Sequence, residues 1–126
     1  MKKVVRTERG WVGHFICGHR CRFRRNTLLE CRNIKIVVST VGKMVNSKDE
    51  FEEIGYERHF ETMAFHAEHD GRYWDASVSK QVYFDSPWAI QEVDADDRAN
   101  DMHEAVVSEI MGKLANGETF KIEDEA

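Results

Sequence analysis

The chain has little of what marks a secreted, membrane-bound or modular protein. Its 126 residues include one proline and three cysteines. No apolar run approaches the roughly 20 residues that a membrane-spanning helix needs. No apolar segment follows the basic start, so we expect no secretory signal. Repeats and low-complexity tracts are also lacking. We therefore predict one cytoplasmic domain over residues 1–126, with an acidic, loosely ordered tail at 118–126.

The cysteines are odd in number, which argues against a disulfide framework. Cys17 and Cys21 flank His19 in a pattern that resembles part of a zinc site. An extended strand would, however, space these side chains about 7 Å apart, too far to converge on one ion alone. We expect free, buried thiols, no metal and no cofactor.

Catalytic motifs are lacking as well. No GxSxG, Walker loop or HExxH occurs, and the six histidines show no catalytic spacing. We therefore expect a protein that is not an enzyme. A histidine-dependent nucleotide hydrolase that uses His14, His19 or His66 stays open as an alternative.

Charge is divided unevenly along the chain. Residues 1–35 carry ten Lys and Arg against two Glu, a net +8, whereas residues 36–126 carry a net −13. The acidic remainder would repel a long nucleic acid, but a small phosphorylated ligand could bind within the basic third. The same acidic segment leaves another alternative open, an inhibitor that mimics nucleic acid and blocks a nucleic-acid-binding complex.

The first half of the chain predicts strands. Extended segments are indicated at 11–17, 20–25, 27–31 and 34–41. Arg32-Asn33 is the expected turn between the last two. Residues 42–57 are expected to form a mobile excursion rather than a core element.

The second half predicts a hairpin and a helix. Asp70-Gly71 favours a tight turn between strands at 59–67 and 73–84. Carboxylates at 94–97 are expected to cap a helix and to complement its dipole. Asn116-Gly117 is a typical helix end. Between them, apolar residues recur every four positions, at Met102, Val106, Ile110 and Leu114. The predicted fold class is α+β, an antiparallel β-sheet with a C-terminal amphipathic helix packed on one face.

The candidate ligand site begins with three arginines on one side of a predicted strand. Alternation places Arg20, Arg22 and Arg24 about 7 Å apart. A guanidinium group is a planar fork that fits phosphate oxygens, so this stripe predicts a phosphate site. A solvated basic edge strand is the alternative. The candidate site is extended by Arg25, Asn26 and Thr27.

A second group of candidate residues precedes and begins the helix. Phe84 and Trp88 could stack on a base, and Asn100 could read the base edge or the ribose. Arg98 would add charge, and first-turn N–H groups could contact a phosphate. The alternative is that the two aromatics are core residues and Asn100 lies on the surface.

Five segments carry a resemblance to a known family: WVGHFICGHRCRFRRNTLLE, IVVSTVG, GRYWDASVS, DSPW and RANDMHEAVVSEI. Over about residues 9–112 the chain resembles the anti-Thoeris sponge proteins of phages and prophages. Those are non-enzymatic oligomers that sequester cyclic ADP-ribose isomers made by TIR-domain defence enzymes, and some also hold cyclic oligonucleotides. The resemblance implies a homo-oligomer in the cytoplasm of an infected bacterial host, which binds a small cyclic nucleotide and so blocks anti-phage defence. It assigns no ligand contact residue by residue.

Overall fold

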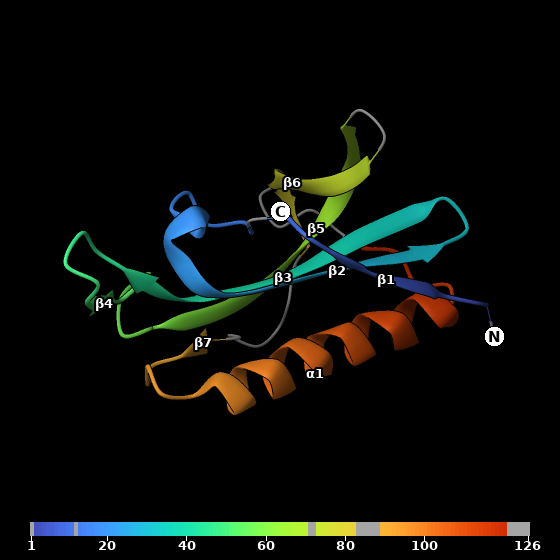
Figure 1. Ribbon diagram of the computed structural model, residues 1–126. Coiled ribbons are helices and arrows are strands. Elements are labelled where there is room, and N and C mark those ends of the chain that lie inside the picture. The colour runs from blue at the N-terminus through green and yellow to red at the C-terminus, as the bar shows by residue number, and fades with distance from the viewer. Residues whose placement is uncertain (1, 12, 71–72, 83–88, 121–126) are drawn as a thin grey trace.

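The strands and one long helix form two layers in the computed structural model, which describes residues 2–11, 13–70, 73–82 and 89–120 (Figure 1). The elements follow in the order β1 (Val5–Arg9), the short 3-10 helix η1 (Gly18–Arg20), β2 (Cys21–Cys31), β3 (Ile34–Val45), β4 (Phe51–Glu52), β5 (Phe60–Asp70), β6 (Tyr73–Gln81), β7 (Ala89–Ile90) and α1 (Asp96–Ala115). An antiparallel sheet with a C-terminal helix against it is the α+β fold that the sequence predicts.

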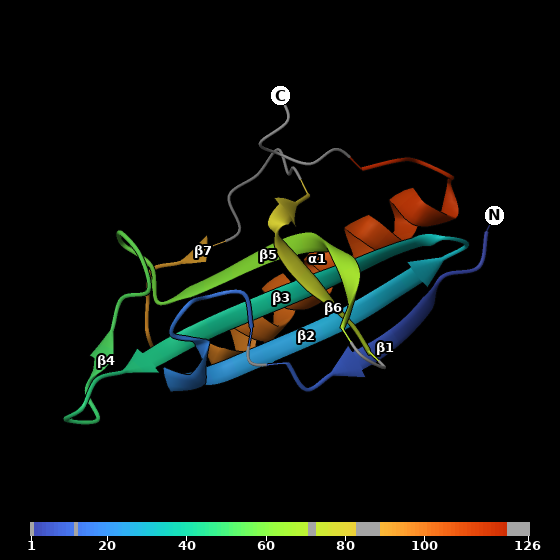
Figure 2. The ribbon, with the colours of Figure 1, turned by 90° about the horizontal axis from the view of Figure 1, so that it is seen from above.

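The sheet follows the order β1-β2-β3-β5-β6, with β4 added to β3 and β7 added to β5. Every neighbouring pair of strands is antiparallel. β5 and β6 form the predicted hairpin. Their register shifts between Phe65 and Ala67, and β6 then crosses over the sheet on the side away from α1 (Figure 2).

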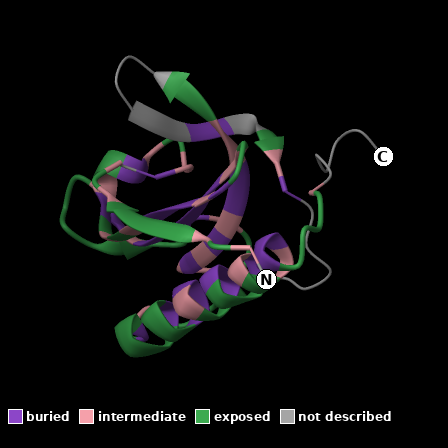
Figure 3. Ribbon diagram, turned by 90° about the vertical axis from the view of Figure 1, so that its right-hand side faces the viewer, coloured by how far each residue is buried: buried purple, intermediate pink, exposed green. Residues whose placement is uncertain are grey.

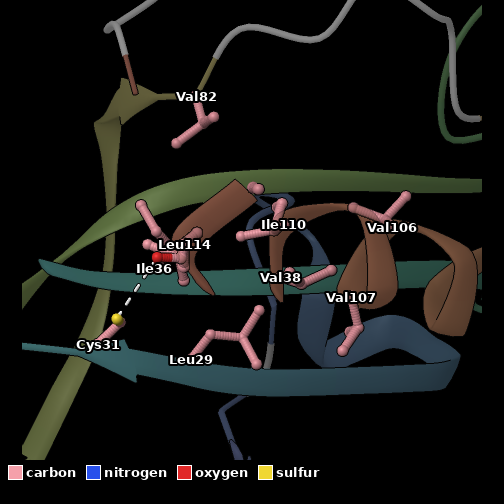
Figure 4. Close-up of a cluster of buried hydrophobic side chains, with 10 residues drawn as sticks. Leu29, Cys31, Ile36, Val38, Val82, Val106, Val107, Ile110 and Leu114 are labelled. Atoms are coloured by element: carbon pink, nitrogen blue, oxygen red, sulfur yellow. Dashed lines mark hydrogen bonds between the residues drawn. The ribbon is translucent and has the colours of Figure 1, made fainter. Parts of the chain in front are cut away.

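Helix α1 packs through the predicted apolar stripe. Val106, Ile110 and Leu114 are buried against Leu29 of β2 and Ile36 of β3 (Figure 4). The helix ends where expected, since Gly117 takes a φ of 80° that glycine adopts without strain. Its start differs from the prediction. The capping position is Ala95, which provides no side-chain cap, so Asp96 and Asp97 of the first turn complement the dipole only.

Two predictions about the N-terminal strands are wrong. Residues 11–17, predicted to be extended, contain no strand where the structure describes them; Ile16 and Cys17 form a turn, and η1 follows. The segments 20–25 and 27–31, predicted separately, belong to the single strand β2, with Arg20 left in η1. The Arg32-Asn33 turn between β2 and β3 is confirmed, and Arg32 has a φ of 57° there.

The predicted excursion at 42–57 is wrong for residues 42–45, 51–52 and 54, which belong to the sheet or to the core. β3 continues to Val45, and Met44, Val45 and Ile54 are buried. The turn after β3 is held by Asn46, whose Oδ1 accepts the backbone N–H groups of Lys48 (2.8 Å) and Glu50 (3.0 Å). A composition rich in Lys, Asp and Glu hides this order, because Met44, Val45 and Ile54 are the buried apolar side chains of the segment.

The predicted tail begins on the core. Phe120 packs against the cluster beneath α1, and its carbonyl oxygen lies 3.1 Å from Nε2 of His66. The rest of the tail, 121–126, lies outside the described residues. Within the described ranges, no helix has both the length and the apolar character needed to cross a membrane.

Candidate ligand-binding face

The sheet has two faces that differ in what covers them. The helix face lies against α1, and from Phe23 to Cys31 of β2 it carries the odd-numbered residues, as Leu29 and Thr27 show by their contacts with helix residues. The distal face carries the even-numbered residues of β2, since Leu28 clusters with Val37, Phe65 and Ala76. β6 and the segment between β1 and η1 cross this distal face (Figure 2).

Two of the predicted arginines, Arg22 and Arg24, are exposed, and alternation with Phe23, which packs with Met102 of α1, turns them to the distal face. Arg22 forms an ion pair with Asp49 at 3.1 Å, but the two side chains are 62% and 82% exposed, so solvent screens the pair strongly. Arg24 is exposed and forms no hydrogen bond or ion pair with the described part of the chain. Both guanidinium groups can therefore bind an external anion without losing a strong ion pair within the chain.

Arg20 is separated from this pair by the local fold. It belongs to η1 rather than to the strand, so the stripe of three arginines predicted from alternation does not form. Its Nε donates to the carbonyl oxygen of Val45 at 2.9 Å, and its guanidinium lies 3.8 Å from Glu52. Arg20 thus fastens η1 to the end of β3.

Arg25 and Thr27 point to the helix face instead. The Arg25 guanidinium pairs with Glu8 at 2.6 Å and with Glu104 at 2.9 Å. Thr27 is fully buried; its hydroxyl donates to Glu8 at 2.8 Å and lies 2.7 Å from Nε2 of His103. Alternation explains this placement, because a strand with Arg22 and Arg24 on one face turns Arg25 to the other.

The helix residues of the candidate site are also on the far side. Arg98 and Asn100 lie exposed on α1, which covers the helix face, and Arg98 pairs with Glu92 at 2.9 Å. The structure does not bring them together with Arg22 and Arg24. Phe84 and Trp88 lie outside the described residues.

Asn26 is the predicted site residue with the most unusual surroundings. It is 2% exposed on the distal face, two residues from Arg24, and its Nδ2 donates to the carbonyl oxygen of Trp11. Its Oδ1 is buried and has no hydrogen-bond partner among the described residues. A buried acceptor without a donor is costly, so this oxygen is suited to an N–H or O–H group from outside the chain.

A cluster that sequence reasoning missed lies on the same face. His14, from the segment before η1, bridges two strands: its Nδ1 is 2.9 Å from Oγ of Ser39, and its Nε2 is 2.9 Å from Oε1 of Glu61. A carboxylate only accepts, so Nε2 carries the proton and Nδ1 accepts the Ser39 hydroxyl. The sequence separations of 25 and 47 residues left no local signal.

The charge of Glu61 is balanced within this cluster. Burial alone would raise the pKa of Glu61, but the hydrogen bond from His14 and the guanidinium of Arg58, at 2.8 Å, hold that pKa below its ordinary value. Ser39 is fully buried, and its hydroxyl also accepts the backbone N–H of His14 at 3.3 Å. The order serine, histidine, carboxylate resembles a hydrolytic relay, yet here the serine is closed to substrate and the contacts fasten a loop to the sheet.

The thiols are free, and Cys21 and Cys31 are buried while Cys17 is partly exposed. Burial raises the pKa of Cys21, which makes it a poor nucleophile. In the part of the chain that the structure describes, no three His, Cys, Asp or Glu side chains gather as a metal would require. Cys17, His19 and Cys21 therefore do not converge.

Comparison with known proteins adds nothing to this geometry. No family model, no curated protein and no solved structure matches the chain.

Proposed function

We propose that the protein is a non-enzymatic binding protein for a compact, phosphate-bearing nucleotide, which it holds on the distal face. The observation that carries this proposal is one local arrangement. Exposed Arg24 lies two residues from Asn26, whose buried Oδ1 has no hydrogen-bond partner in the described part of the chain, and exposed Arg22 is on the same face as Arg24. The arginines would bind phosphate oxygens, and the asparagine oxygen would accept a donor of the base or sugar.

The ligand class follows from charge and from the resemblance described above. A net charge of −5, with the positive charge concentrated near the N-terminus, favours a small anion over a long polyanion. A cyclic nucleotide immune signal, such as a cyclic ADP-ribose isomer or a cyclic oligonucleotide, combines phosphates with base and ribose donors. Sequestering such a signal in an infected bacterial cell would block anti-phage defence without any catalytic step.

A second candidate function, hydrolysis of the nucleotide, is favoured by the contacts of His14 with Ser39 and Glu61. It requires the segment around His14 to open, because Ser39 is fully buried. Phosphate binding by the exposed guanidinium groups of Arg22 and Arg24 requires no such movement, and we therefore prefer sequestration.

One experiment separates these functions. The protein is incubated with a cyclic ADP-ribose isomer, freed of unbound ligand, denatured by heat, and the supernatant is analysed by mass spectrometry. Release of intact ligand supports sequestration, and release of a linear or cleaved product supports hydrolysis. If the chain retains nothing from a panel of cyclic nucleotides, the proposal is wrong and inhibition of a protein partner becomes the better hypothesis.

A further inference from the structure

The outer edge of β1 is unpaired in the part of the chain that the structure describes. β1 pairs with β2 on one side, and no other described strand pairs with it. The strand is exposed from Val5 to Glu8 (Figure 3). The exposed fraction of Val5 is 47%. Backbone N–H and C=O groups along such an edge can pair with another strand, so a natural edge is either protected or used.

We propose that this edge pairs with β1 of a second copy of the chain. The two strands would be antiparallel, and the two-fold axis would pass between the two copies of Thr7. The sheet would then continue from one subunit into the other, with both α1 helices on the same side. Thr7 would face Thr7 of the second copy, Arg6 would face Glu8, and Val5 would face Arg9. Closed two-fold dimers are the commonest form of homo-oligomer.

The charges of β1 select this register. A two-fold axis perpendicular to the sheet places residues of the same face opposite each other. Two copies of one residue must therefore face each other across the axis. Centred on Arg6 or on Glu8, the pairing would place two like charges directly opposite each other, which is destabilising. Centred on Thr7, it places Arg6 opposite Glu8 twice and uses all five residues of the strand.

The side chains that would meet are already oriented by the subunit itself. Arg6 is held by Glu104 through two hydrogen bonds of 2.8 and 2.6 Å, and Glu8 is held by Arg25 at 2.6 Å and by Thr27. Pairing about Thr7 would join the two clusters across the axis at little further cost in side-chain entropy. Charged residues on an edge strand usually prevent pairing with unrelated strands. The alternating charges of β1 disfavour other strands in the same way, but they are complementary to those of a second β1.

A cysteine placed on the axis tests the register. In a Cys17→Ser background, where Cys21 and Cys31 are buried, Thr7→Cys puts two thiols on directly opposite residues, with Cβ atoms roughly 5 Å apart. Val5→Cys is the matched control, because two residues at position 5 would lie four positions out of register, roughly 14 Å apart. We expect Thr7→Cys to form a covalent dimer on mild oxidation without nucleotide, and Val5→Cys to stay largely uncrosslinked.

A mixture extends the test. Val5→Cys combined with Arg9→Cys should give the mixed disulfide in preference to either homodimer, because these positions face each other in the proposed register. Sedimentation of the unmodified protein at micromolar concentration should give a mass of two chains or an even multiple. A single-chain mass, or crosslinking of Val5→Cys that equals that of Thr7→Cys, would overturn the proposal.

Discussion

At the scale of single residues, Gly42 of β3 lies close against neighbouring side chain and backbone. A Cβ there would overlap the ring of Phe60 and stand 2.7 Å from the carbonyl oxygen of His59. Phe60 is fully buried and cannot move aside. We expect Gly42→Ala to destabilise the fold by roughly 1–3 kcal/mol, as overpacking does, measured by urea denaturation.

Gly112 of α1 is the matched control. A Cβ there meets nothing within 4 Å. Gly112→Ala should therefore raise stability by about 0.5–1 kcal/mol, because alanine has the higher helix propensity. Equal effects of the two substitutions would contradict the close approach at Gly42.

His14 is the residue that fastens the segment before η1 to the sheet. Removing its ring would take away the acceptor of the Ser39 hydroxyl proton and the donor to Oε1 of Glu61. We expect His14→Ala to cost roughly 1–3 kcal/mol and to speed tryptic cleavage at Arg20 and Arg22. His19→Ala, which changes an exposed ring nearby, should leave both unchanged; a matching response from the two variants would argue against this role.

At the scale of elements, α1 meets the sheet through one buried polar group as well as through its apolar stripe. His103 is fully buried, with Nδ1 2.7 Å from Oγ1 of Thr40 and Nε2 2.7 Å from Oγ1 of Thr27. Thr27 gives its proton to Glu8, so it accepts from Nε2–H, and Nδ1 accepts from Thr40. Thr40 in turn accepts from Thr62 at 2.6 Å. Each hydroxyl is used once, which fixes the neutral tautomer of the ring.

This neutral histidine makes stability depend on pH. Burial, aided by the positive charge of Arg25, lowers the pKa of His103 from 6.5 to about 4. The unfolded chain therefore binds a proton at a higher pH than the folded one. The contribution of neutral His103 to the free energy of unfolding is fully present above pH 6.5. It is lost as the pH falls from 6.5 through about 4, and the loss is at most roughly 3 kcal/mol. The urea midpoint of the protein should fall across this window.

His103→Gln isolates the effect, since an amide can hydrogen-bond to the two threonines without titrating. We expect the variant to be less stable at pH 7 but to lose little more between pH 6.5 and 5. At lower pH the protonation of carboxylates also reduces stability, because hydrogen bonds from Arg6 in the folded protein lower the pKa of Glu104 to about 2. A variant whose stability still fell as steeply between pH 6.5 and 5 would show that another group titrates there.

At the scale of the whole molecule, the sheet separates Arg22 and Arg24 from Arg98 and Asn100. We expect Arg22→Glu with Arg24→Glu to abolish nucleotide retention while changing the melting temperature by only a few degrees, because exposed charges contribute roughly 0–1 kcal/mol. Arg98→Glu with Asn100→Ala, on the opposite side of the molecule, is the matched control and should retain ligand. Retention by the first variant, or loss by the second, would place the site elsewhere.

The hairpin and the helix could be predicted because their signals are local. Asp70-Gly71 favours its turn by backbone preference alone, and the spacing from Met102 to Leu114 follows from the period of a helix. The β2–β3 turn at Arg32-Asn33 was equally local. Buried His103, by contrast, sits within this apolar helix stripe, and its partners Thr27 and Thr40 are 76 and 63 residues away. No pattern in the helix sequence predicts that Thr27 and Thr40 are the partners of His103.

The sequence by itself determined the fold class, the helix bounds to within a few residues and the concentration of arginine near the N-terminus. Only the tertiary structure decided which of those arginines is open to a ligand. Local alternation treated Arg20, Arg22 and Arg24 alike, but η1 removes Arg20, and β1 and α1 supply the carboxylates that occupy Arg25. The physical reason is that a guanidinium is free or paired according to the charges that folding brings within a few ångströms of it, and those come from distant parts of the chain.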